Sequence, residues 1–220
     1  NFNIIICSRN LEKLDVIAKE IEEECNCDCN FLFFDINNEL SHLDLLNNLK
    51  VFPDVILFSV GMMSNQPKDD LNIEKTKMIV NTNYFSPILF LEKVCDYFYK
   101  KNKSVSFIVL SSVAGEKGRK KNYIYGSAKA GLSNYVSGLR QKYANTNVRL
   151  LTVVLGFVNT ERTKDMKMMS FLRGKSSDVA KKIYYSHIRK KHLIFLPKKW
   201  RLIILIIKLI PEKFFIKMNF

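Results

Sequence analysis

The chain has 220 residues, of which 47% are hydrophobic and 25% are charged; this supports a sizeable core and fits one α/β domain, although the length alone allows about one to two. It contains no low-complexity segment and no internal repeat, which excludes a disordered or repeat architecture. The net charge of +14 indicates an anionic partner, such as a phosphorylated cofactor, an anionic membrane face or nucleic acid, or else a Lys-rich solvated surface.

The elements predicted from the sequence alternate along the chain. Apolar runs predict strands at 3–7, 31–34, 55–58, 105–110, 148–154 and 193–196, and the runs at 31–34 and 55–58 are typical of buried strands. Helical patterns cover 11–21 with Asn10 as N-cap, 39–50, 73–101 with an interruption near Pro87, a segment that ends near 143, and a helix that starts at 177–178. This alternation predicts a parallel sheet with helices on both faces.

Polar or glycine-containing segments follow four of these strands: Ser8-Arg9, Asp35, Ser59-Val60-Gly61 and Ser111-Ser112. Because ligands of open parallel sheets lie beyond the carboxyl ends of the strands, we expect these segments to share one edge and a binding site.

Five cysteines are present, at positions 7, 25, 27, 29 and 95. The cluster at 25–29 separates neighbouring cysteines by one residue, whereas paired zinc ligands usually stand two to four residues apart and need a second pair. We therefore predict no metal site. The odd number of cysteines without a signal peptide favours free thiols in a reducing compartment.

The stretch 111–131 carries the strongest chemical signal. Tyr125 and Lys129 stand four residues apart on a predicted helix, which places both side chains on one face. Ser112 closes the preceding strand. A Tyr–Lys pair at this spacing is commonly an ordinary surface pair, so the order of all three residues is what favours a catalytic site.

With these residues the chain resembles the short-chain dehydrogenase/reductase family over nearly its whole length. Ser112 precedes Y-x-x-x-K, Asn83 lies in N-Y-F-S-P, residues 59–61 replace the usual Asn-Ala-Gly, and 156–160 read G-F-V-N-T. The segment 111–132 and the tail at 197–203 are similar to reductases of a decaprenylphosphoryl 2-keto pentose. The resemblance implies a Rossmann-like, doubly wound α/β fold.

Chemistry and resemblance together assign catalytic roles. A free tyrosine has a pKa near ~10, and a nearby ammonium favours the phenolate, so Lys129 is placed to make Tyr125 the acid for ketone reduction. Ser112 would donate a hydrogen bond to the carbonyl oxygen. The resemblance implies that Lys129 also binds the nicotinamide ribose and that Asn83, with Asn81 as the alternative, holds a relay water. Ser111 is expected to be structural and Tyr123 to line the substrate pocket.

The same edge supplies cofactor contacts. Arg9, next to Ser8, suits the 2′-phosphate of NADP better than the free hydroxyl of NAD. The resemblance assigns Asp35 to the adenine and Thr160 to the nicotinamide carboxamide, and it places Ile36, Ser59 and Gly61 in the cofactor site.

Besides Ser59-Val60 in place of Asn-Ala, two features depart from the family pattern. The family begins with a strand, a Gly-rich turn and a helix that together bind the pyrophosphate, and this chain lacks them. We therefore expect an N-terminally truncated chain that lacks roughly 25–30 residues. We expect this truncated chain to bind cofactor poorly. Leu155 stands where the family usually has Pro. We expect a reductase domain at 1–197 and a helical tail at 198–220.

The tail is basic and apolar. Its apolar run is far shorter than the ~20 residues that span a bilayer. It is flanked by Trp200 and six basic residues, namely Lys198, Lys199, Arg201, Lys208, Lys213 and Lys217. These features predict an interfacial helix on an anionic membrane. A helix packed on the domain, or in a homo-oligomer interface, is the alternative.

The sequence thus predicts a cytoplasmic NADP-dependent oxidoreductase, peripheral on the inner face of the membrane. It would reduce a keto group on a lipid-linked or nucleotide-linked sugar in cell-envelope polysaccharide synthesis. The alternative is a catalytically inactive Rossmann-type binding or scaffold fragment. Nucleic-acid binding lacks a recognisable motif.

Overall fold

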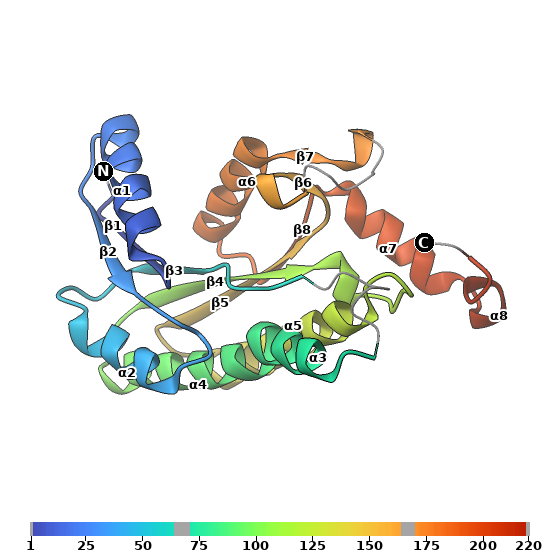
Figure 1. Ribbon diagram of the computed structural model, residues 1–220, viewed down its shortest axis with the longest axis horizontal. Helices are drawn as coiled ribbons and strands as arrows, with labels where there is room; N and C mark the ends of the chain where they lie inside the picture. The colour runs from blue at the N-terminus through green and yellow to red at the C-terminus, as the bar shows by residue number, and fades with distance from the viewer. Residues whose placement is uncertain (1, 64–70, 164–169, 219–220) are drawn as a thin grey trace. The chain divides into compact units, whose positions relative to one another are not determined.

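The computed structural model describes residues 2–63, 71–163 and 170–218 (Figure 1). Two compact units make up the chain, Asn1–Phe52 and Pro53–Phe220.

The first unit is a βαβ unit followed by a short helix. Its elements are β1 (Ile4–Ser8), α1 (Leu11–Cys25), β2 (Cys29–Phe33) and α2 (Glu39–Asn48), and β1 pairs with β2 in parallel. Asn10 caps α1 as predicted, because its side chain accepts a hydrogen bond from the Lys13 N–H at 2.8 Å. The helix ends at Cys25 and is capped by Asn26, whose backbone is left-handed (φ 48°) and whose N–H donates to the Glu22 carbonyl.

The expectation of a fully buried strand at 31–34 is wrong for two of its residues. Phe31 and Phe33 are 37% and 48% exposed, while Phe34 is buried. The sheet of this unit has two strands, so each side chain has few neighbours that could cover it.

The second unit contains a parallel sheet of four strands in the order β3-β4-β5-β8. These strands are β3 (Val55–Phe58), β4 (Val105–Ser112), β5 (Val148–Leu155) and β8 (Leu193–Leu196). The helices are α3 (Ile73–Val80), α4 (Ser86–Lys100), α5 (Tyr123–Lys142), α6 (Ser176–Ile188), α7 (Lys199–Leu209) and α8 (Glu212–Phe215). A short parallel pair, β6 (Val158–Asn159) with β7 (Gly174–Lys175), lies outside the main sheet.

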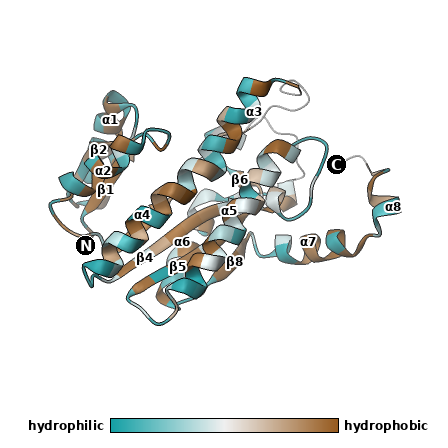
Figure 2. Ribbon diagram, turned by 90° about the horizontal axis from the view of Figure 1, so that it is seen from below, coloured by the Kyte–Doolittle hydropathy of each residue, from teal (hydrophilic) through white to brown (hydrophobic). Residues whose placement is uncertain are grey.

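Helices cover both faces of this sheet. In Figure 1, α3, α4 and α5 lie on one face and α6 lies on the other. The two central strands are brown in Figure 2 and carry the core, which includes the fully buried Phe107 and Val109 of β4 and Val153 of β5. This is the parallel α/β arrangement that the alternation of elements predicts, and it agrees with the Rossmann-like fold that the resemblance implies.

The helix predicted over 73–101 consists of three consecutive pieces. Between α3 and α4 the chain forms a π-helical segment, Asn81–Phe85. The interruption therefore precedes Pro87, which occupies the first turn of α4, where its missing N–H leaves no hydrogen bond unmade. A π segment widens the helix locally and redirects its side chains, and this one contains Asn83.

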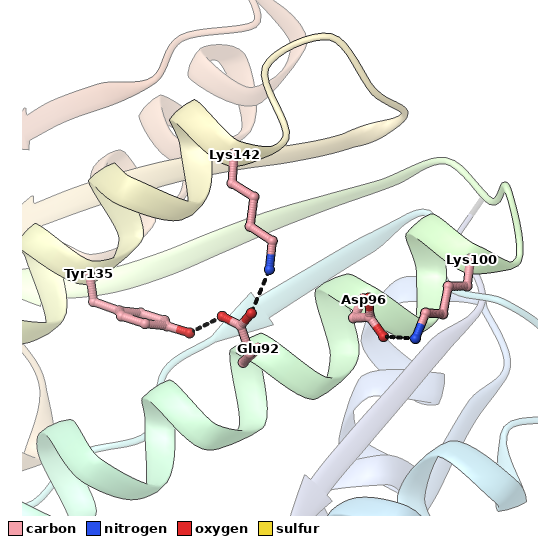
Figure 3. A network of polar contacts seen from close by, with 5 residues as sticks. All are labelled: Glu92, Asp96, Lys100, Tyr135 and Lys142. Carbon is pink, nitrogen blue, oxygen red and sulfur yellow. Dashed lines mark hydrogen bonds and ion pairs between the residues drawn. The ribbon is translucent and has the colours of Figure 1, made fainter.

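A polar network ties α4 to α5 (Figure 3). The Glu92 carboxylate accepts a hydrogen bond from the Tyr135 hydroxyl and pairs with the Lys142 ammonium at 2.5 Å. Lys142 and Tyr135 both hold the pKa of Glu92 below its ordinary value, while burial, together with the bond to Glu92, raises the pKa of Tyr135. Within α4, Asp96 and Lys100 form a second pair at 2.8 Å.

The C-terminal tail is helical as predicted, and its first helix packs on the second unit. Trp200 and Ile204 are buried against Val113 and Val154. Gly156 makes this possible, because a Cβ at that position would lie 2.2 Å from the Trp200 ring. The Trp200 indole N–H donates to the Leu172 carbonyl at 3.1 Å. Across the described ranges, no helix combines the length and apolarity needed to cross a membrane.

Candidate functional site

Ser111 and Ser112 close strand β4 with different roles. The Ser112 hydroxyl oxygen accepts the Ala114 N–H at 3.1 Å and so starts the 3₁₀ turn η2 (Val113–Gly115). Ser111 is buried; its hydroxyl lies 2.6 Å from the Ser133 hydroxyl and donates to the Lys129 carbonyl at 3.3 Å. Ser111 thus fastens β4 to α5, while Ser112 stands half-buried at the carboxyl end of the strand.

Two glycines let α5 lie directly against η2. A Cβ at Gly126 would stand 2.6 Å from the Ala114 carbonyl oxygen, and one at Gly115 would stand 2.7 Å from the Ala130 nitrogen. Tyr125 precedes Gly126 and is half-buried. The close approach therefore holds the turn of α5 with Tyr125 and Lys129 beside the carboxyl end of β4.

Lys129 is a buried cation, 4% exposed. Its ammonium donates to the backbone carbonyls of Val60 at 3.3 Å and Leu110 at 3.2 Å. Burial of a charge is costly unless hydrogen bonds compensate it, and these carbonyls provide that compensation. They also fix the ammonium between the ends of β3 and β4.

Asn83 is fully buried and holds the loop that follows β3. Its amide nitrogen donates to the carbonyls of Met62 at 2.7 Å and Ile79 at 2.8 Å, and its oxygen accepts the Met62 N–H at 3.1 Å. A Cβ on Gly61 would stand 2.9 Å from the Asn83 oxygen and 3.3 Å from the Lys129 ammonium. Asn83, Gly61 and Lys129 therefore meet, whereas Asn81, the alternative to Asn83, is exposed.

Ser59 and Thr160 occupy exposed positions of the second unit. Ser59 follows the last residue of β3, on the edge where β4 ends. Thr160 follows β6, and its N–H donates to the Thr163 hydroxyl at 3.2 Å. Both side chains are accessible to a ligand.

The residues predicted in the first unit lie at the carboxyl ends of its two strands. Ser8 is the last residue of β1, and the exposed Arg9 follows it. After β2, the Asp35 N–H donates to Ser41 at 2.9 Å, and Ile36 is buried. The first unit thus gathers its predicted residues at the carboxyl edge of its sheet.

Sequence reasoning missed the packing roles of Gly115 and Gly126. A signal was available for Gly126, because glycine is unfavourable inside a helix and indicates a close backbone approach there. The cysteines are all free thiols. The described part of the chain brings together no group of three His, Cys, Asp or Glu side chains that could hold a metal ion.

The residues of the second unit fit a nicotinamide cofactor with a carbonyl substrate. A phenol, a hydroxyl and a buried ammonium stand near the carboxyl ends of β3 and β4, and the missing side chain of Gly61 leaves room for the Asn83 amide and the Lys129 ammonium. These groups can bind ribose hydroxyls and exchange a proton with a carbonyl oxygen.

Comparison with known proteins adds a family match. The model of the short chain dehydrogenase family matches residues 1–170. An uncharacterized oxidoreductase of Mycobacterium tuberculosis is 26% identical over 212 residues, which cover 95% of this chain and 84% of the relative. An NADP-dependent 3-hydroxy acid dehydrogenase of Schizosaccharomyces pombe is 28% identical over 162 residues, covering 72% of this chain and 62% of that protein.

Solved structures share the fold at low sequence identity. A short-chain dehydrogenase from Sphingobium yanoikuyae in complex with NADPH has a TM-score of 0.77 and 13% identity, and the match covers 96% of this chain and 88% of that one. A 7β-hydroxysteroid dehydrogenase has a TM-score of 0.78 and 16% identity, with coverages of 98% and 86%. At such identities the likeness concerns the fold.

Proposed function

Because the chain belongs to the short-chain dehydrogenase family and is an oxidoreductase, we propose that it uses NADPH to reduce the keto group of a lipid-linked or nucleotide-linked sugar. The observation that carries this proposal is the buried ammonium of Lys129, which lies on the same helix as Tyr125. Two backbone carbonyls, from outside that helix, hold the ammonium in place. A fixed cation near a phenol favours proton release from the phenol, which suits Tyr125 to acid–base catalysis near neutral pH.

In the direction of reduction, Tyr125 donates a proton to the carbonyl oxygen of the substrate. Ser112 already accepts the Ala114 N–H, so its own O–H is directed to other acceptors and can stabilise the oxygen as negative charge develops. Lys129 binds the nicotinamide ribose and Asn83 holds a water that replenishes the proton. NADPH, when bound, supplies the hydride.

The choice of NADPH rests on Arg9. Its exposed guanidinium directly follows β1 and is available to a 2′-phosphate, with Ser8 beside it. Asp35 would contact the adenine, Thr160 the carboxamide, and Ile36, Ser59 and Gly61 other parts of the cofactor. The NADP-dependent relative and the structural neighbour in complex with NADPH support this choice.

The choice of substrate rests on the tail and on the segment that links Ser112 to Tyr125. Their resemblance to reductases of a decaprenylphosphoryl keto sugar supports a role in cell-envelope polysaccharide synthesis. Six basic residues at 198–217 support a location at the inner, anionic face of a membrane, where such a substrate resides.

The test is NADPH oxidation by the full-length protein with a panel of keto sugars. Tyr125→Phe removes the proton donor and should lower kcat about 10²-fold or more. Tyr185→Phe, a change of the same size on the exposed face of α6, is the control and should retain the wild-type rate. A Tyr125→Phe enzyme with full activity would refute the mechanism.

A further inference from the structure

The loop between η2 and α5 ends in a tight turn immediately before the catalytic helix. The Asn122 N–H donates to the Arg119 carbonyl at 3.0 Å, and the Asn122 carbonyl accepts the Gly126 N–H at 2.7 Å. Arg119 and Asn122 therefore begin and end one turn, and Tyr125 follows three residues later. The backbone of this segment is fixed at both ends.

Two charged residues earlier in the loop have partners in the C-terminal tail. Glu116 pairs with Lys208, and Lys117 pairs with Glu212 at 2.6 Å while lying over the Phe215 ring. These contacts hold the loop against α7 and α8. The position of the turn is thus supported by the tail as well as by the backbone.

Arg119 differs from these neighbours. Its side chain is half-buried, yet within residues 2–63, 71–163 and 170–218 its guanidinium has no hydrogen-bond or ion-pair partner. Burial lowers the pKa of Arg119. Removing a charge from water without a compensating partner costs free energy, and a bound anion would offset that cost.

Asn122 presents a complementary feature. Its side-chain oxygen is buried and accepts no hydrogen bond from the described residues. It occupies the N-cap position of α5, where an Asn side chain commonly bonds to the first turn, but it makes no such bond. A buried acceptor without a donor costs about 1–3 kcal/mol, so a ligand hydroxyl would stabilise it.

We propose that Arg119 and Asn122 form a subsite for the phosphate-bearing end of a sugar substrate. Arg119 would bind the phosphate, for which the planar guanidinium fork is suited, and Asn122 would accept a hydrogen bond from a sugar hydroxyl. The inference rests on the proposed function, since Tyr125 of the same segment would protonate the keto group. Lipid-linked and nucleotide-linked sugars share this phosphate.

The decisive measurement compares a keto sugar that carries a phosphate with its neutral analogue, using the full-length enzyme. Arg119→Gln should raise KM for the phosphate-bearing sugar by roughly 10- to 100-fold, as expected for a lost charge-assisted hydrogen bond, and leave KM for the neutral sugar unchanged. Arg119→Lys should restore part of the affinity. Lys120→Gln, which removes an exposed charge from the same loop, is the matched control and should change neither value.

Equal effects of Arg119→Gln on both sugars, or no effect on either, would overturn the phosphate assignment. Asn122→Ala should raise KM for both sugars, because both carry the hydroxyl; unchanged values would remove Asn122 from the subsite. Separate arms with a lipid-linked and a nucleotide-linked sugar show which source of phosphate depends more strongly on Arg119.

A binding experiment separates failure of this subsite from failure of the proposed function. Calorimetric titration of the full-length protein with glucose 1-phosphate requires no turnover. Binding that weakens at least about tenfold in Arg119→Gln, and not in Lys120→Gln, supports the subsite even if no keto sugar is reduced. Binding that is absent from the wild type, or equal in both variants, rejects it.

Discussion

Lys129 shows how backbone carbonyls hold a cation inside the protein. The ammonium is bound by the carbonyls of Val60 and Leu110, which carry dipoles but no net charge. Carbonyl dipoles do not cancel the charge of the cation, so its field still acts on a nearby phenol. The arrangement therefore suits an electrostatic role toward Tyr125.

Arg9 gives a prediction about the cofactor. Arg9→Ala should raise KM for NADPH by roughly 10- to 100-fold, because a charge-assisted hydrogen bond to the 2′-phosphate is lost, and should leave KM for NADH nearly unchanged. Steady-state kinetics with both cofactors measures this split. Lys13→Ala, in the first turn of α1, removes a nearby positive charge and is the control. Equal loss with both cofactors would contradict the assignment of Arg9 to the phosphate.

The sequence alone reveals those site residues that lie close to one another along the chain. Ser112, Tyr125 and Lys129 form a recognisable order because a strand end and one helix turn fix them. The meeting of Gly61, Asn83 and Lys129 could not be predicted, because it joins three segments that are distant in the chain. The Arg119 guanidinium has no partner among the described residues, and this could not be predicted either, because the tail pairs with Glu116 and Lys117 instead.

Helix α5 contains a glycine with open space beside it, whereas the segment after β5 contains a glycine in close contact with a side chain. Gly138 is exposed within α5 with no atom near its would-be Cβ, so Gly138→Ala should stabilise the protein by about 0.5–1 kcal/mol. Gly156→Ala would place a Cβ 2.2 Å from the Trp200 ring and should destabilise by about 1–3 kcal/mol. Urea unfolding measures both. A stable Gly156→Ala variant would show that α7 is free to shift.

The Glu92 network gives a pH dependence for the α4–α5 contact. Because its partners hold the pKa of Glu92 below the unfolded value, ionised Glu92 stabilises the folded state above that unfolded value, near ~4.3. This contribution is lost as the pH falls through the lower, folded-state pKa. The stability difference between wild type and Glu92→Gln should therefore be constant near neutrality and shrink below about pH 4. Urea unfolding from neutral to acidic pH tests this. A difference that grows toward acid would contradict it.

Element types were more predictable than their details. The sequence locates β3 at its observed bounds, because an apolar run lies between clear turn signals. It does not predict the π segment at 81–85, since N-T-N-Y-F contains no residue that breaks a helix. The run at 202–207 is apolar on all sides, so only packing could show which side faces the protein.

The packing of α7 on the rest of the second unit divides the apolar residues of this helix into a buried face and an exposed face. Trp200 and Ile204 are buried in the second unit. The outward face carries four exposed aliphatic residues at the spacing of one helical stripe, namely Leu202, Leu205, Ile206 and Leu209. The tail also carries exposed basic residues before, within and after this helix. An apolar stripe on a basic tail matches the surface of an anionic membrane in both polarity and charge.

We therefore expect the full-length protein to bind vesicles containing phosphatidylglycerol, and to bind neutral phosphatidylcholine vesicles far more weakly. Leu205→Glu with Leu209→Glu places charges on residues that are 54% and 73% exposed, and it should reduce binding at least tenfold because apolar burial is lost and anionic repulsion is added. Leu40→Glu with Leu43→Glu on α2, at 70% and 50% exposure, is the matched control and should bind as the wild type does. Added salt should weaken binding, since the basic residues act through screened charge. Co-sedimentation with vesicles measures each of these expectations. Sedimentation of the protein without vesicles adds a further test. If the α7 variant dissociates an oligomer while vesicle binding is unchanged, the stripe joins copies of the chain and the membrane assignment is wrong.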